Sequence, residues 1–259
     1  PLALEQLQGR LEAERDAGGI RLSAHDLAFL TRDGLAWPAG GLTLAWRQMQ
    51  DLHEPWTAST LVTGGEVAAD RLNLDAMARI AERAPLGRPV RSLLAALAPR
   101  GTVERLKARW SGPWDQPATY QVDARLSDIT LQAGAPPLAA EGHGTPGRPG
   151  VRQAQIDVSA SERGGEARLA IKAGALVFPG LWEQPEMSLD ELDATLSWRI
   201  VPTPGRPSAI EVKLAKARFA NADMQGEAVA TWNSGAGDYT ARGGRFPGRL
   251  DLTGKLQRG

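Results

Sequence analysis

The sequence contains no cysteine, so neither a disulfide framework nor a thiolate metal site holds the fold together. Its three histidines, His25, His53 and His143, lack the spacing of metal ligands. Basic and acidic residues balance at 30 each, so the basic excess typical of nucleic-acid-binding proteins is missing. No apolar run approaches the roughly 20 residues of a membrane-spanning helix. With 42% hydrophobic residues, the chain has ample material for a core.

Sequence motifs for catalysis are also missing. The stretch from Gly142 to Gly147 matches G-x-G-x-x-G, but Arg148-Pro149-Gly150 follows it, and no helix can start there as a dinucleotide site requires. There is no Walker A motif, no G-x-S-x-G and no H-E-x-x-H. The acidic residues around Glu191 are best interpreted as a solvated face. We therefore predict that the chain is not an enzyme and has no cofactor or metal site. A pair of catalytic carboxylates that are distant in the sequence and meet only in the fold would not be detected in this way.

Helical periodicity is confined to residues 73–101. Asn73 is a suitable N-cap, and Asp75 can pair with Arg79 one turn later. Pro85 ends a first helix and Pro89 suits the first turn of a second. The sequence predicts two short amphipathic helices that pack on an apolar surface, as a plug or end-cap in preference to a gate. The candidate plug residues are Leu74, Met77, Ala81, Val90, Leu93, Leu94 and Leu97.

Most of the remaining chain alternates with the period of β-strands. Asp33-Gly34 predicts a hairpin with a type I′ turn. Four strands end in tryptophan after apolar residues at every second position, which is typical of half-buried antiparallel strands. Either each tryptophan belongs to an ordinary core, or together they mark the rim of one apolar surface, where the indole N–H reaches water. The groove candidates are Leu42, Leu44, Trp46, Leu106, Trp110, Leu196, Trp198, Ala228, Ala230 and Trp232.

We expect one mainly β segment over residues 1–259, with a helical insert at 73–100; a sub-boundary near residue 101 is also compatible with the sequence. The chain starts at Pro1 rather than Met and ends in strand-like sequence. We therefore expect an internal piece of a longer protein.

Several short motifs occur in an order that resembles the YhdP-type branch of the AsmA-like proteins of Gram-negative bacteria. None is strongly specific alone, but the ordered set covers most of the chain. They are Asp33-Gly34 with Trp37-Pro38, Leu72-Asn73-Leu74, Leu97 to Gly101 running into Leu106 and Trp110, Phe178-Pro179, Leu192 to Trp198, Ala220 to Asp223, Gly226 to Trp232, and Gly248 to Gly254.

The resemblance implies a strongly curved antiparallel sheet, a taco-like groove lined with apolar residues. It also implies a periplasmic part of a protein held in the inner membrane by an anchor outside this chain. The partners would be phospholipid or another acyl-chain lipid and the remaining segments of the same protein, and no nucleic acid. The implied role is movement of phospholipid between the inner and outer membranes in support of the outer-membrane permeability barrier.

Two other functions remain open from the sequence. A structural or interaction module of the cell envelope would use the same strands to seal a core, without a lipid conduit. An enzyme acting on envelope glycans or lipids would need a cleft with converging carboxylates of perturbed pKa. The lipid species, the direction and energy source of transport, the partner proteins and the oligomeric state are not encoded in any feature that we recognise.

Overall fold

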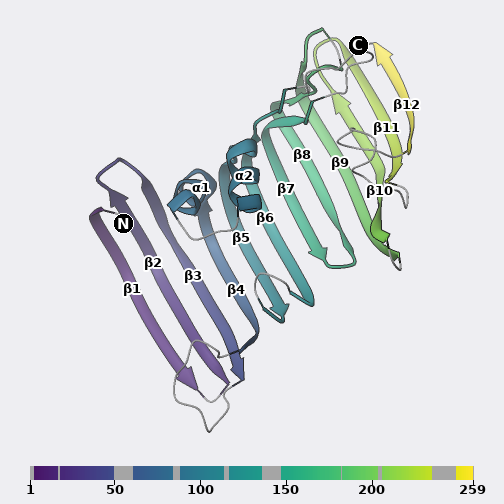
Figure 1. The fold of residues 1–259 in the computed structure, drawn as a ribbon. Coiled ribbons are helices and arrows are strands. Elements are labelled where there is room, and N and C mark those ends of the chain that lie inside the picture. Colours follow the sequence, from purple (N-terminus) through teal and green to yellow (C-terminus); the bar gives the residue numbers. More distant parts are fainter. Residues whose placement is uncertain are drawn as a thin grey trace. The chain divides into compact units, whose positions relative to one another are not determined.

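The computed structural model describes residues 3–16, 18–49, 61–83, 88–113, 117–135, 147–181, 183–203, 206–234 and 249–258. They form a mainly β structure, a 12-stranded antiparallel sheet whose strand order follows the chain, with two short helices between the fourth and fifth strands (Figure 1). The predicted fold class is confirmed to this extent; strong curvature of the sheet stays a prediction.

Each strand hydrogen-bonds to its sequence neighbours, so the sheet is a simple meander. The strands are β1 (Leu4–Asp16), β2 (Gly19–Thr31), β3 (Ala36–Met49), β4 (Leu61–Asn73), β5 (Arg100–Ser111), β6 (Thr119–Leu131), β7 (Gly150–Ser161), β8 (Gly164–Val177), β9 (Glu186–Thr203), β10 (Arg206–Ala220), β11 (Met224–Asn233) and β12 (Arg249–Arg258). The helices are α1 (Leu74–Arg83) and α2 (Arg88–Leu97). Neither described helix is long and apolar enough to cross a membrane.

The chain divides into two compact units, which are described separately below. Unit 1 comprises Pro1–Pro85, Thr102–Leu126 and Ser159–Glu162; unit 2 comprises Leu86–Gly101, Ser127–Val158 and Arg163–Gly259. That the chain acts as one continuous segment stays a prediction.

The start of α1 follows the local sequence signals. The Asn73 side-chain oxygen accepts a hydrogen bond from the Ala76 N–H at 2.8 Å, which makes Asn73 the N-cap. Asp75 and Arg79 form the expected ion pair at 3.1 Å. Pro89 lies in the first turn of α2, and Ala98 ends that helix with a left-handed φ of 38°. The corner at Pro85-Leu86-Gly87 lies outside the described residues.

The hairpin predicted at Asp33-Gly34 is confirmed, but the predicted type I′ turn is wrong. Gly34 has a φ of +78°, whereas Asp33 is not among the residues with positive φ, and a type I′ turn needs both. Instead, the turn is closed by the Thr31 side chain. Its hydroxyl accepts a hydrogen bond from the Leu35 N–H at 3.0 Å and donates one to the Asp33 carboxylate.

Several strands contain a non-glycine residue in the left-handed region, where the side chain is unfavourable. They are Asp26 in β2, Arg71 in β4, Asp128 in β6, Gln153 in β7 and Ala173 in β8, with φ of 51°, 49°, 54°, 57° and 53°. At Asp26 the register of β2 shifts against both β1 and β3, which marks a β-bulge, a local bend of the strand. At Arg71 the pairing of β4 with β5 keeps its register, as does the pairing of β8 with β9 at Ala173.

Candidate functional site

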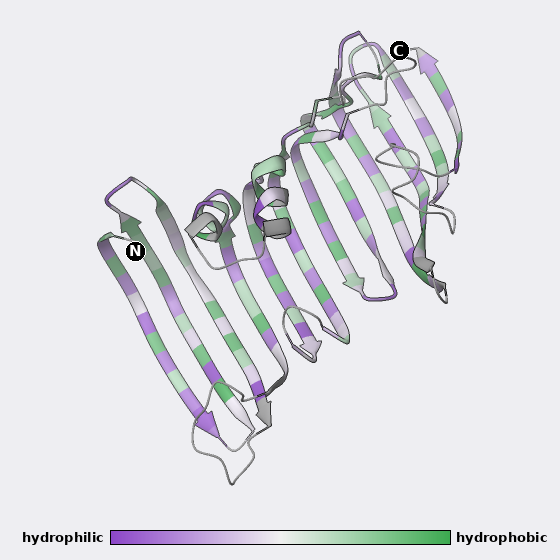
Figure 2. Ribbon diagram, in the orientation of Figure 1, coloured by the Kyte–Doolittle hydropathy of each residue, from purple (hydrophilic) through white to green (hydrophobic). Residues whose placement is uncertain are grey.

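In unit 1, the strand register aligns apolar side chains into rows that run across β2, β3, β4 and β5. Side chains alternate between the two faces of a strand, so residues two positions apart share a face. Figure 2 shows this alternation as bands along each strand. The rows are Ala24, Leu42, Ala69 and Leu106; then Leu22, Leu44, Val67 and Ala108; then Ile20, Trp46, Gly65 and Trp110.

In unit 2, strands β8 to β12 repeat this arrangement. Trp198 of β9 and Trp232 of β11 both lie opposite Val212 of β10. The rows are Ile171, Leu192, Phe219, Gly226 and Leu256; then Leu169, Ala194, Ala217, Ala228 and Gly254; then Ala167, Leu196, Leu214, Ala230 and Leu252; then Gly165, Trp198, Val212, Trp232 and Leu250. The register therefore gathers the ten groove candidates, five in each unit, on one apolar surface per unit.

These apolar surfaces are open. All ten groove candidates are half-buried, and none belongs to the fully buried core. The surface continues onto the outermost strands, where Leu11 of β1 is 70% exposed and Leu252 of β12 is 64% exposed. Large exposed apolar surface of this kind is uncommon on a monomeric soluble domain and marks an interaction site.

Burial in unit 1 increases toward one end of the strands, where α1 covers the sheet. Ala69, Leu72 and Val103 form a buried cluster there. Leu74 and Met77 of α1 pack against it, as do Trp37, Leu42, Leu106 and Leu126 from the strands. The first turn of α1 thus docks on the apolar face, as the plug interpretation expects.

The other plug candidates divide into two sets. Leu94 and Leu97 of α2 are half-buried. The side chains of Ala81, Val90 and Leu93 lie outside the described residues. The end of α2 is held within unit 2, because the Gln132 N–H donates to the Leu97 carbonyl at 2.8 Å and the Arg148 guanidinium donates to the carbonyls of Ala96 and Gln132. The roles of the plug residues stay a prediction.

The opposite end of the unit 1 strands is marked by tryptophan and glycine. A Cβ atom at Gly65 would overlap the indole ring of Trp110, so the ring lies directly over this glycine. The Trp110 Nε1 is buried and has no hydrogen-bond partner in the described part of the chain. The expectation that the indole N–H reaches water is therefore wrong for Trp110. Sequence reasoning missed the pairing of tryptophan with glycine, because only the register brings them together.

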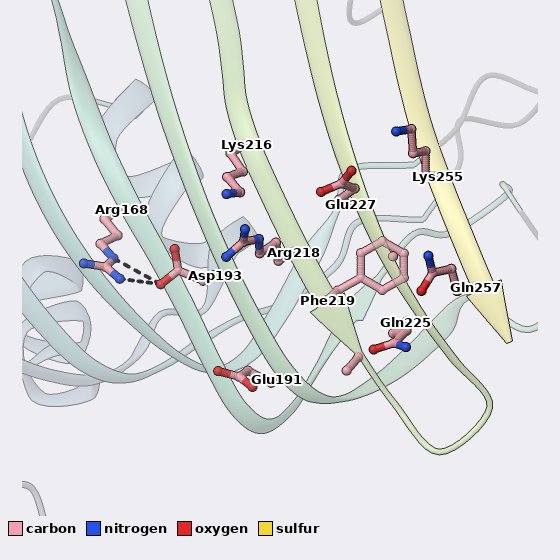
Figure 3. A pocket seen from close by; sticks show the side chains of 12 residues that line it. Arg168, Glu191, Asp193, Lys216, Arg218, Phe219, Gln225, Glu227, Lys255 and Gln257 are labelled. Carbon is pink, nitrogen blue, oxygen red and sulfur yellow. Dashed lines mark hydrogen bonds and ion pairs between the residues drawn. The ribbon is translucent and has the colours of Figure 1, made fainter. Parts of the chain in front are cut away.

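The other face of unit 2 is charged. Register aligns Asp193, Arg218, Glu227 and Lys255 across β9 to β12, with alternating sign. Figure 3 shows these side chains around an open hollow of about 690 Å³. Arg168 donates to Asp193 from its Nε at 3.2 Å, and this hydrogen bond with the Asp193 charge raises the pKa of Arg168. Such a lining suits water rather than an acyl chain.

Among the described residues, acidic side chains and histidines do not converge into a metal site. In the described ranges no group of three or more His, Asp or Glu side chains could hold a metal ion. Glu191 and Asp193 face the charged hollow, as their interpretation as a solvated face expects. His25 lies 3.8 Å from Glu12 on the exposed surface. His53, His143 and most of the G-x-G-x-x-G match lie outside the described residues.

In each unit the fold presents an open apolar face of an antiparallel sheet, and in unit 2 the opposite face is charged. The family model of the YhdP protein matches residues 1–259, the whole chain. The chain therefore belongs to the YhdP family. Neither the search of curated proteins nor the search of solved structures gives a match.

Proposed function

We propose that the apolar face is part of a periplasmic groove that conducts phospholipid between the inner and outer membranes and supports the outer-membrane permeability barrier. In this proposal the chain is not an enzyme. It works with the other segments of a longer protein that is anchored in the inner membrane outside this chain. Family membership supports the lipid-transport role at the level of the family.

The observation that carries the proposal is the half-exposed apolar surface that continues onto the outermost strands. Burial of each CH₂ group of an acyl chain contributes about 0.8 kcal/mol, so a lined groove needs continuous apolar area and no chemistry. The rows through Leu44 in unit 1 and Leu196 in unit 2 supply such area across four or more strands. The register shifts around Asp26 in β2 mark a β-bulge, a local bend that favours a curved sheet.

The alternative is a structural or interaction module with a sealed core. A sealed core would bury the groove candidates in the described structure, yet all ten are half-buried. The buried clusters occupy only part of the apolar face. This distribution of burial favours the groove.

Photo-crosslinking tests the proposal. A photoreactive amino acid is placed at Leu44, Leu196 or Ala230, and the chain is exported to the periplasm of a Gram-negative host before irradiation. We expect covalent adducts of phospholipid mass at all three positions. Matched controls at Thr43, Thr195 and Thr231 put the same probe one residue away, on the opposite face, and should give no adduct.

The outcome is measured by intact-mass spectrometry. Adducts on the apolar face alone support the groove. An absence of adducts at Leu44, Leu196 and Ala230, together with a lipid-free native mass spectrum of the purified chain, contradicts it and favours the sealed module.

A further inference from the structure

In each unit, one part of the apolar face is buried and the end that carries the tryptophans is more exposed. In unit 1, the α1 end holds the buried Ala69, Leu72 and Val103, and Leu74 and Met77 of the helix close it. At the other end, the row of Ile20, Trp46, Gly65 and Trp110 crosses the strands near the loops. We call this the tryptophan row of unit 1.

Unit 2 has the same polarity. Ile171 of β8 and Leu192 of β9, near the middle of their strands, are only 1% and 5% exposed, and Ala175 and Leu189 beyond them are 4% and 2% exposed. The row of Gly165, Trp198, Val212, Trp232 and Leu250 lies toward the other end, and its members are half-buried or, for Leu250, exposed. This is the tryptophan row of unit 2.

We infer that a phospholipid in the groove lies along the strands, with its phosphate and glycerol ester groups at the tryptophan rows and its acyl tails toward the buried ends. This inference rests on the proposed function. Indole rings combine an apolar body with one N–H donor, and they are therefore enriched where apolar and wet regions meet. At the α1 end of unit 1, the buried cluster of Ala69, Leu72 and Val103 offers apolar contacts, which suit the tails.

One detail of unit 1 extends the row. Hydrogen bonds from Arg109 to Gln121 and between Ser111 and Thr119 place Tyr120 beside Trp110, so the aromatic row continues into β6.

Two photoreactive phosphatidylethanolamines test the inference on the complete 259-residue chain. One carries a diazirine on the headgroup and the other at the end of one acyl tail; both are supplied in phosphatidylethanolamine vesicles. Crosslinked residues are mapped by peptide mass spectrometry. We expect the ratio of headgroup to tail labelling to exceed unity at Trp46, Trp110, Trp198 and Trp232, and to fall below unity at Leu42, Leu106 and Leu192.

Equal ratios along the strands, or a reversed gradient, overturn the orientation while the groove itself stands. An absence of labelling by both probes on the apolar face overturns the proposed function as well. The W46L/W110L variant keeps the apolar area but removes both indoles, and we expect tail labelling to persist while the headgroup gradient in unit 1 is lost. Trp232→Leu repeats the test in unit 2, in case the double variant fails to fold; an unchanged gradient in a folded variant contradicts a role for the indoles.

Discussion

The α1 end and the tryptophan end of unit 1 belong to the same strands and the same face, yet they differ in what covers them. Leu72 is 4% exposed beneath α1, whereas Leu44, farther from the helix along the same face, is half-buried. Strand alternation is the same at both ends, so it cannot distinguish a core position from a groove position. Only the docking of Leu74 and Met77 makes one end a core.

The largest difference in stability between the two ends is expected for Leu72→Ala compared with Leu44→Ala. Truncation beneath α1 leaves a cavity, and we expect a loss of about 2–5 kcal/mol in the free energy of unfolding. At Leu44 no closed cavity forms, so we expect a loss of about 1 kcal/mol or less. Urea titrations of both variants and the unchanged chain measure the two values. Equal losses would mean that the face around Leu44 is sealed like the α1 end.

At the tryptophan end of unit 1, Gly65 leaves room for the ring of Trp110, so Gly65→Ala should disturb the packing there. A methyl group at Gly65 overlaps the ring of Trp110, so the indole must move, at a cost of about 1–3 kcal/mol. Tryptophan fluorescence and urea titration check the displacement and the cost. Gly254→Ala is the matched control in β12, because a Cβ there meets its nearest atom, a backbone oxygen, at 3.3 Å. A silent Gly65→Ala variant would contradict the packing of the ring on this glycine.

Local signals predicted the α1 end better than the rest of the molecule. Asn73, Asp75 and Arg79 act within a few residues of one another, so their cap and ion pair could be predicted from the sequence. The tryptophan rows were predicted as separate strands, but the partners of each tryptophan depend on register, which the sequence leaves free. The contact between Trp110 and Gly65 joins residues 45 positions apart and carries no local signal.

Strand irregularities limited the sequence prediction in another way. Register shifts on both sides of Gln6 to Gln8 interrupt the period of two in β1, so this strand is harder to recognise from alternation alone. The left-handed residues at Arg71, Gln153 and Ala173 were not anticipated, because these residue types do not favour that conformation. Aspartate tolerates the left-handed conformation, so only Asp26 and Asp128 could have been suspected from the sequence.

A smaller effect is expected where α1 begins. Asn73→Ala removes the acceptor of the Ala76 N–H and should lower the free energy of unfolding by about 1 kcal/mol. Asn73→Asp keeps an acceptor and should restore most of that stability. If the docking of α1 depends on the cap, hydrogen exchange should also accelerate at Met77 more than at Trp46. If hydrogen exchange accelerated equally along the whole face, the cap would not be what holds α1 against the sheet.

The smallest effect is expected on the charged face, at Arg168→Gln. The pair with Asp193 is well exposed, and exposed ion pairs contribute little to stability because water and salt screen them. The hydrogen bond to Asp193 raises the pKa of Arg168, so on the alkaline side its contribution is fully present below the ordinary pKa of an arginine side chain and is lost only as the pH rises through the raised value. At pH values of about 5 to 9, the midpoint of thermal unfolding of the variant should therefore stay close to that of the unchanged chain. Lipid crosslinking at Leu196 should also be unchanged, since Arg168 faces the charged hollow rather than the apolar rows. Loss of crosslinking in a stable Arg168→Gln variant would place the lipid on the charged face and reverse the comparison between the two faces.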